Sequence, residues 1–266
     1  MKGFVYLLMG KAHAELFVVS CFNLRKFWDG PVILFVAEDD DHPILAEIAK
    51  SDLGVELQKI PIKNLKKNSA MAAKTTLWRH SRLDEAIYLD CDTLPVGDLS
   101  GLFTSNLTIT AFAEWVSTGS TVKKRIQQWA GISPLIDEMV NRTANRERAI
   151  NTGVFAWGKN YSELYRWEDL CMVRPGNFLC DEIAMQLIYP ELPHVRITDH
   201  RFNCSPTYGK EQDDVRCWHF HGKRKHLRKE EGRKLWLPAF REVLDNNIAN
   251  ITEWVATGER HLRDHI

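Results

Sequence analysis

The chain has 266 residues, of which 44% are hydrophobic and 26% charged, and its 35 basic side chains balance 35 acidic ones. This composition is typical of a soluble globular enzyme built around one large domain. A net charge of zero gives no reason to expect a general affinity for nucleic acid or for anionic membranes. The six cysteines are dispersed, without a C-x-x-C pair, which argues against a zinc site or a disulfide scaffold and favours a reducing, cytoplasmic location.

The first eighty residues alternate between strand and helix patterns. The apolar run Phe4–Met9 is too short for a signal peptide or a membrane span and predicts a first strand. Further strands are expected over residues 31–40 and 55–62, and helices over residues 12–27, from about Asp41 to Gly54, and over residues 69–82. This β-α-β order predicts right-handed crossovers and a mostly parallel sheet.

The fourth predicted strand runs directly into two carboxylates. Four apolar residues, 86–89, precede Asp90-Cys91-Asp92, as expected for a strand buried on both faces. Side chains alternate along a strand, so Asp90 and Asp92 should face the same way at the strand end where α/β sheets bind ligands. A divalent cation that also holds a phosphate would balance these charges. Taken alone, Asp-x-Asp is equally typical of a turn or of a helix cap.

The second half of the chain carries further polar signals. Strands are expected over residues 107–115 and 150–158, and an irregular, partly helical segment suited to covering a cleft over residues 117–148. A helix should begin at Asp181-Glu182, with both carboxylates at its positive end. After a loop over residues 201–208, an alternating strand over 217–226 puts His219 and His221 on one side. Two helices are expected at residues 234–244 and 248–255.

Neither a G-x-G-x-x-G motif after a strand nor a G-x-x-x-x-G-K-[S/T] motif occurs in the sequence, so a phosphate would have to be held by a metal ion and side chains. Four motifs nevertheless occur in an order that resembles glycosyltransferase family 8, the metal-dependent GT-A enzymes that include glycogenin and bacterial galactosyltransferases. The resemblance covers residues 4–225. The matching positions are Lys74 with Trp78, the D-x-D at Asp90–Asp92, the Asn-Thr-Gly-Val-Phe segment at Asn151–Phe155, and the H-x-x-G-x-x-K motif from His219 to Lys225.

The resemblance implies an α/β architecture of GT-A type, with a Rossmann-like, mostly parallel central sheet flanked by helices. Residues 1–226 would form the glycosyltransferase domain, with a nucleotide-binding half at 1–115 and an acceptor-side half at 116–226. Residues 227–266 would form a helical C-terminal extension. The basic residues and the aromatic residues Trp236, Phe240 and Trp254 of this tail suggest acceptor docking or a homodimer contact, or alternatively packing on the domain.

The family pattern also implies a metal site and a diphosphate site. Asp90, Asp92 and His219 would ligate Mn²⁺, with Mg²⁺ as the alternative ion, because two carboxylates and one imidazole favour manganese over calcium. Lys225, with Gly222 in the same motif, would hold the diphosphate of a nucleotide-sugar. Judged by residue type alone, His219 and His221 form an ordinary surface pair, and Lys225 belongs to a solvated basic run.

The remaining family positions concern the donor sugar and the base. Lys74, Asn151 and Asn203 would contact the ribose or the sugar. His13 stands where the family has a tyrosine that stacks on the base, which leaves the base open, with UDP as the default.

Asp181 and Glu182 fall where the family has Asp-Gln, and these two are the expected catalytic residues. Asp181 would bind donor sugar hydroxyls. Glu182 would lie near the reacting carbon, where retaining transfer passes through an oxocarbenium-like state. Because glutamate replaces glutamine here, Glu182 has three interpretations: a nucleophile, a stabiliser of positive charge, or the start of a helix.

The expected activity is therefore metal-dependent transfer of a hexose from a UDP-sugar to a hydroxyl of a glycan, lipid or protein, with retention implied by the family alone. One alternative is a sugar nucleotidyltransferase, which normally has a glycine-rich basic loop after the first strand, where this chain has only Gly10 and Lys11. Another is a non-catalytic module that binds a nucleotide-sugar or a glycan.

Overall fold

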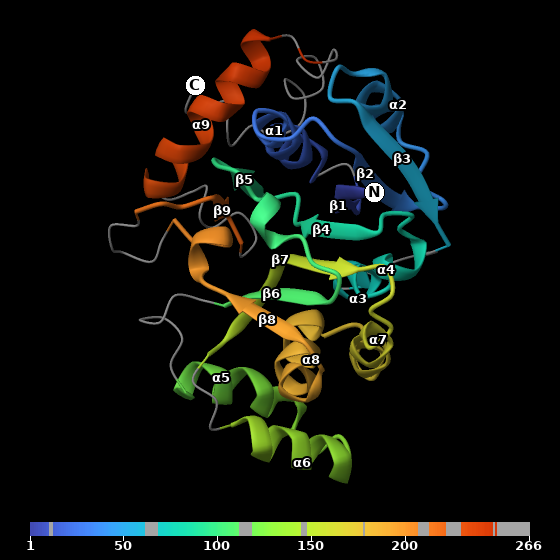
Figure 1. Ribbon diagram of the computed structural model, residues 1–266, viewed down its shortest axis with the longest axis vertical. Coiled ribbons are helices and arrows are strands. Elements are labelled where there is room, and N and C mark those ends of the chain that lie inside the picture. The colour runs from blue at the N-terminus through green and yellow to red at the C-terminus, as the bar shows by residue number, and fades with distance from the viewer. Residues whose placement is uncertain are drawn as a thin grey trace. The chain divides into compact units, whose positions relative to one another are not determined.

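The computed structural model describes residues 1–10, 13–61, 69–111, 119–144, 148–177, 179–206, 213–221, 230–246 and 248. Seven of its strands belong to one mixed sheet in the order β3-β2-β1-β4-β7-β6-β8 (Figure 1). The pairs β1–β2, β2–β3 and β6–β8 are parallel, and β6–β7 is antiparallel. Helices flank this sheet. The predicted fold class, a mostly parallel α/β sheet, is thus confirmed.

The chain divides into two compact units, each assembled from separate stretches of sequence. Unit 1 comprises Met1–Lys2, Asn64–Tyr88 and Ser100–Cys204, and unit 2 comprises Gly3–Lys63, Leu89–Leu99 and Ser205–Ile266. The domain boundaries expected at residues 115 and 226 stay a prediction.

Unit 2 begins with the three parallel strands at one end of the sheet. Every residue of β2 is buried, which explains why its sequence is entirely apolar. Its elements are β1 (Lys2–Leu8), α1 (Ala14–Arg25), β2 (Val32–Ala37), α2 (Pro43–Lys50), β3 (Val55–Ile60), β5 (Thr93–Pro95), β9 (Cys217–His219) and α9 (Glu230–Asp245). Strands β5 and β9 form a separate two-stranded antiparallel sheet.

The start of α2 shows a small departure from the sequence prediction. The cap is His42, whose Nδ1 accepts the backbone N–H of Ile44, and Pro43 occupies the first turn. Asp41, which the sequence places at the helix start, instead lies 2.6 Å from Lys59 Nζ. An imidazole nitrogen can satisfy a helix N–H as a carboxylate does, so the helix still begins within two residues of the expected position.

Helix α9 packs on α1 (Figure 1). Its aromatic residues Trp236 and Phe240 are buried, and the ring of Trp236 meets Phe220 edge-on at 5.0 Å. Lys26, the residue directly after α1, forms an ion pair with Glu242. These two aromatic side chains therefore belong to the core of unit 2 and do not offer a dimer contact or a docking surface. The second predicted tail helix, with Trp254, lies outside the described residues.

Unit 1 holds the other end of the sheet and most of the helices. Helices α7 and α8 pack together, and α8 also packs on β7. Its main elements are α3 (Ser69–Lys74), α4 (Leu77–His80), β4 (Glu85–Leu89), β6 (Leu107–Ala111), α5 (Gly119–Ile126), α6 (Pro134–Thr143), β7 (Ile150–Gly158), α7 (Leu164–Met172), α8 (Cys180–Ile188) and β8 (Val195–Thr198). Short 3₁₀ turns lie at Ser100–Leu102, Gln127–Trp129, Tyr189–Glu191 and His200–Phe202.

An aromatic cluster forms the core of unit 1. The ring of Phe155 lies 5.0 Å from Tyr88, 5.4 Å from Trp157 and 5.1 Å from Trp167. Offset and edge-on contacts of this kind contribute about 0.5–1.5 kcal/mol each beyond the area they bury. The cluster fixes α7 against β7, and with it the neighbouring helix α8.

The helix predicted over residues 69–82 is divided in two. The hydroxyls of Thr75 and Thr76 donate to the carbonyl oxygens of Ala72 and Ala73, a local alternative to the helical ladder. Strand β9 is shorter than expected, because it ends at His219 and does not include Phe220 or His221. Of the strand predicted over residues 107–115, the structure describes only residues 107–111, and these form β6.

Candidate functional site

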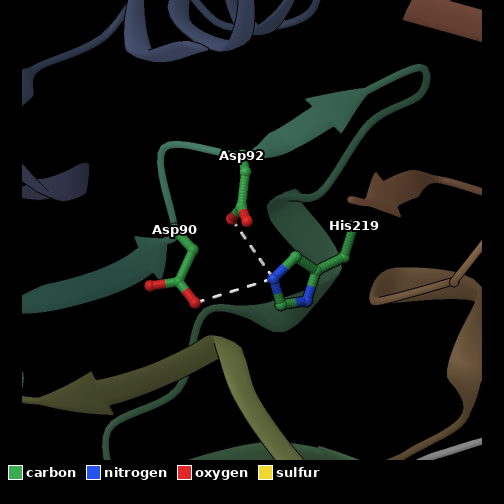
Figure 2. Close-up of side chains that lie close together, drawn as sticks. All are labelled: Asp90, Asp92 and His219. Carbon is green, nitrogen blue, oxygen red and sulfur yellow. Dashed lines mark ion pairs between the residues drawn. The ribbon is translucent and has the colours of Figure 1, made fainter. Parts of the chain in front are cut away.

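Asp90, Asp92 and His219 form a compact cluster in unit 2 (Figure 2). Nε2 of His219 lies 3.3 Å from Oδ1 of Asp92 and 3.7 Å from Oδ2 of Asp90. The His219 side chain is 4% exposed, and each aspartate side chain is 25% exposed. The cluster is thus anchored at the imidazole and open on the carboxylate side.

The short β5–β9 sheet brings these residues together from distant parts of the sequence. Thr93 of β5 pairs with His219 of β9, and the backbone N–H of Phe220 donates to Asp92 O at 2.8 Å. This antiparallel register places the imidazole beside the Asp-x-Asp segment. The sequence predicted one long strand for β9; three residues are sufficient for this placement.

The two aspartates face one direction because of a turn, not because of strand alternation. Strand β4 ends at Leu89, and Asp90 O accepts hydrogen bonds from both the backbone N–H and the hydroxyl of Thr93, at 3.1 and 2.8 Å. The thiol of Cys91 points away and donates to Leu7 O at 3.3 Å. The turn expected from the sequence is therefore present, and the interpretation of the same residues as a ligand pair stays a prediction.

Histidines set the electrostatics of Asp92. Burial alone would raise the pKa of this carboxyl, but the charge and hydrogen bond of His219, together with the charges of His13 and His221, outweigh burial and hold the pKa of Asp92 well below its usual range. Asp92 is therefore ionised at neutral pH. His13 precedes α1 as its N-cap residue, and its charge contributes to the field at the predicted metal site.

The donor set of this cluster fits a divalent cation. One ligand atom from each of Asp90, Asp92 and His219 lies within 4.8 Å of the others. Two carboxylate oxygens and one imidazole nitrogen suit Mn²⁺ better than Ca²⁺ or Mg²⁺, which take oxygen ligands almost exclusively. Without a cation the two carboxylates would repel each other, so an ion would stabilise the arrangement.

A second group of predicted residues forms a buried polar network in unit 1. Nζ of Lys74, at the end of α3, lies 2.9 Å from Oδ2 of Asp181, and both side chains are almost fully buried. The same carboxylate oxygen accepts the hydroxyl of Thr152 at 2.6 Å, and Lys74 also donates to Thr152 O at 3.3 Å. A buried ion pair of this kind needs such extra hydrogen bonds to offset its desolvation.

The network continues through the amides of Asn151 and Asn203. Nδ2 of Asn151 donates to Oε1 of Glu182 at 2.6 Å, and Oδ1 of Asn151 accepts from Nδ2 of Asn203 at 2.8 Å. Asn203 also donates to the hydroxyl of Thr110 at 2.7 Å. The hydrogen bonds and ion pairs thus form two sets within unit 1, one with Lys74 and Asp181 and one with Asn151, Glu182 and Asn203. The two sets adjoin because Thr152 follows Asn151, and Glu182 follows Asp181, in the chain.

A β-bulge exposes this polar segment of β7 to α8. Between Ile109 and Thr110 of β6, the paired residue on β7 jumps from Phe155 to Asn151. The Thr110 hydroxyl lies 3.0 and 2.9 Å from the carbonyl oxygens of Asn151 and Val154, to which it donates. Bulges re-aim side chains and are common beside active sites. The Asn-Thr-Gly-Val segment at residues 151–154 lies at this irregular part of β7.

The first turn of α8 supplies both carboxylates, as expected from the sequence. Asp181 and Glu182 occupy that turn, where the helix dipole favours negative charge. Leu179 immediately before the helix has a left-handed backbone with φ 62°, and the indole N–H of Trp167 donates to Asp181 O at 2.8 Å. The aromatic core of unit 1 therefore holds the backbone of this turn at Asp181.

The structure accordingly places the predicted residues in two groups, one in each unit. Gly222 and Lys225 lie outside the described residues. The polar network also contains two residues that the sequence analysis does not single out, Arg125 and Thr110, and it contains Thr152 of the quoted Asn151–Phe155 segment. Arg125 belongs to a basic run without a motif, so its contact with α8 has no signal in the sequence.

No protein-family model matches the sequence, and no curated protein matches it. Solved glycosyltransferase structures do resemble the fold. The galactosyltransferase LgtC in complex with donor and acceptor sugar analogs is 15% identical, with a TM-score of 0.62 over 92% of this chain and 95% of that chain. An LgtC active-site mutant with a glutamine replaced by glutamate gives 16% identity and a TM-score of 0.61, over 92% and 96%.

A third similar structure is the WbbM bifunctional glycosyltransferase, at 12% identity and a TM-score of 0.57, over 86% of this chain and 47% of that chain. Such low identities establish a shared fold, namely that of GT-A glycosyltransferases, and not a shared substrate. Among the described residues, no helix is both long enough and apolar enough to cross a membrane.

Proposed function

We propose that this chain is a metal-dependent glycosyltransferase that moves a hexose from a UDP-sugar to an acceptor hydroxyl with retention. The observation that carries the proposal is the gathering of Asp90, Asp92 and His219 within 4.8 Å in a chain with the fold of the LgtC galactosyltransferase. The nucleotide-sugar, the base and the retention come from the resemblance to glycosyltransferase family 8. The acceptor hydroxyl would belong to a glycan, a lipid or a protein.

In this proposal, Asp90, Asp92 and His219 hold Mn²⁺ or Mg²⁺. A cation bound there would act as a Lewis acid on the diphosphate leaving group. The protein's own contribution is to fix the imidazole beside the Asp-x-Asp segment through the β5–β9 pairing. His13, the family's base-stacking position, would meet the nucleotide, while Lys225 and the backbone at Gly222 would bind its diphosphate.

The buried network of unit 1 supports sugar recognition in the same proposal. Lys74, Asn151 and Asn203 supply N–H donors, and Asp181 and Glu182 supply acceptors. A sugar presents many hydroxyls, each both donor and acceptor, so a rigid set of paired polar groups can select one arrangement of them. Fixed carboxylates also stabilise the positive charge that develops on a donor sugar in the transition state.

The test is UDP release from a panel of UDP-hexoses, with and without Mn²⁺. Wild-type protein should release UDP only when the metal is present, and Asp92→Ala should abolish this release, because a cation would lose one of three ligands. Asp41→Ala is the matched control, since Asp41 lies on the surface and pairs with Lys59. Undiminished release by Asp92→Ala would disprove the metal site.

The same assay separates the alternative functions. Specific binding of a UDP-sugar with Mn²⁺, but without hydrolysis or transfer, would identify a non-catalytic binding module. Formation of a nucleotide-sugar from a nucleoside triphosphate and a sugar phosphate would identify a nucleotidyltransferase. Both outcomes contradict the proposal.

A further inference from the structure

Both carboxylate oxygens of Glu182 are engaged by the protein itself. Oε1 accepts from Nδ2 of Asn151 at 2.6 Å, and Oε2 lies 2.8 Å from NH1 of Arg125. The Glu182 side chain is 8% exposed and that of Arg125 is 21% exposed. The contact therefore forms in a largely water-excluded environment, where an ion pair is screened less than at the surface.

Arg125 is held in place by the backbone of β7. Its NH1 also donates to Ile150 O at 3.2 Å, while the N–H of Ile150 donates to Oε1 of Gln186 at 3.0 Å. Gln186 lies one turn beyond Glu182 on α8. The guanidinium thus connects α5 with both β7 and α8, next to the residue that differs from the family pattern.

The pairing has a direct chemical consequence for Glu182. A guanidinium stays protonated at any pH that a folded protein tolerates, and a positive group within about 4 Å favours the charged form of a carboxylate. An ionised carboxylate accepts hydrogen bonds but cannot donate them, unlike a glutamine amide. A buried glutamate without such a partner would be costly to ionise, whereas a glutamine needs no counter-charge.

We infer that Arg125 is a positioning residue that keeps Glu182 ionised, so that Glu182 stabilises the positive charge that develops on the donor sugar without attacking the reacting carbon. A nucleophile needs an accessible oxygen, but one oxygen of Glu182 is hydrogen-bonded to Asn151 and the other is paired with Arg125. The inference rests on the proposed function and selects one of the three interpretations of Glu182.

The test is a double-mutant cycle with Arg125→Met, Glu182→Gln and the combined variant. Arg125→Met should lower kcat for UDP release about tenfold or more, with little change in the donor KM, because it leaves a buried carboxylate without its counter-charge. In the Glu182→Gln background the same change should cost much less, since an amide needs no partner charge. Arg125→Lys should restore part of kcat, and Lys124→Met, an exposed neighbour on α5, is the matched control.

Three results would overturn the inference. The first is an equal loss of kcat from Arg125→Met in both backgrounds. The second is a covalent sugar on Glu182, detected by mass spectrometry of trapped enzyme. The third is a combination of two results: wild-type protein turns over no nucleotide-sugar, and the effects of the Arg125 and Glu182 substitutions on the free energy of unfolding in urea are still coupled. The pair would then be purely structural. That last result also disproves the proposed function, whereas the first two leave it intact.

Discussion

At the scale of single residues, Lys74 has the largest expected effect on stability. Lys74→Met would leave Asp181 buried with the Thr152 hydroxyl in place of a full counter-charge. Breaking a buried ion pair by removing one partner costs about 3–5 kcal/mol. The free energy of unfolding in urea should fall by that amount, and UDP-sugar turnover should fall with it.

Two further variants make the Lys74 prediction specific. Lys59→Met removes a lysine that pairs with Asp41 at 2.6 Å on the surface, and it should leave the unfolding midpoint nearly unchanged. The double variant Lys74→Met/Asp181→Leu should regain much of the loss, because two apolar side chains carry no unpaired charge. If Lys74→Met unfolds at the wild-type urea concentration, this buried pair does not stabilise unit 1.

The cysteines give a second prediction at the residue scale. All six are buried, and burial raises the pKa of Cys21 and of Cys204 to about 12. The thiolate is the reactive form, so labelling of native protein by an aromatic disulfide reagent should be slow at pH 7 and should remain slow at pH 9. All six thiols should react in denaturant. Rapid native labelling of any thiol at pH 7, located by peptide mapping, would contradict this expectation.

At the scale of elements, the bulge in β7 depends on one hydroxyl from β6. Thr110→Val keeps the size of the side chain but removes the donor to Asn151 O and Val154 O and the acceptor for Asn203. Leaving these buried groups unsatisfied should cost about 1–3 kcal/mol of unfolding free energy and raise the KM for the donor. Thr110→Ser retains the hydroxyl and is the control. Equal stability of the valine and serine variants would show that the bulge is held by other contacts.

The elements also show what the sequence can predict. Hydrophobic periodicity predicts which residues of an element are buried. It therefore places five elements to within a few residues, namely the strands β1, β2, β4 and β7 from their apolar runs and the helix α2 from its amphipathic pattern. The helix α7 and the short strands β5 and β8 have no comparable pattern, so the sequence analysis does not predict them. Their positions follow from tertiary pairing, which overrides local preference.

The candidate site shows the same division. Asp90 and Asp92 are found through spacing and residue type, whereas His219 is found only through the resemblance to glycosyltransferase family 8, and the structure brings the three together. Arg125 is not found, since an arginine in a basic run carries no information about which carboxylate it will meet in space. The direction of Asp90 and Asp92 is predicted correctly but for a different reason, a turn closed by Thr93.

At the scale of the whole molecule, the proposed function implies that donor and metal stabilise the fold together. A ligand that binds only the native state adds about 2.7 kcal/mol at a free concentration one hundred times its dissociation constant. Mn²⁺ with UDP or a UDP-hexose should therefore raise the melting temperature of wild-type protein by several degrees. Either component alone should raise it less, because the diphosphate and the carboxylates would share the cation.

The choice of nucleotide and the role of Asp92 are tested in the same melting experiment. UDP should raise the melting temperature more than ADP or GDP if the base follows the family pattern, and EDTA should reverse the shift. Mn²⁺ with UDP should leave the melting temperature of the Asp92→Ala variant unchanged. The Asp41→Ala variant, which changes a surface carboxylate, should show the same rise in melting temperature as wild type. A full shift in EDTA would mean that the nucleotide binds without the cation, and the cluster of Asp90, Asp92 and His219 would then need another explanation.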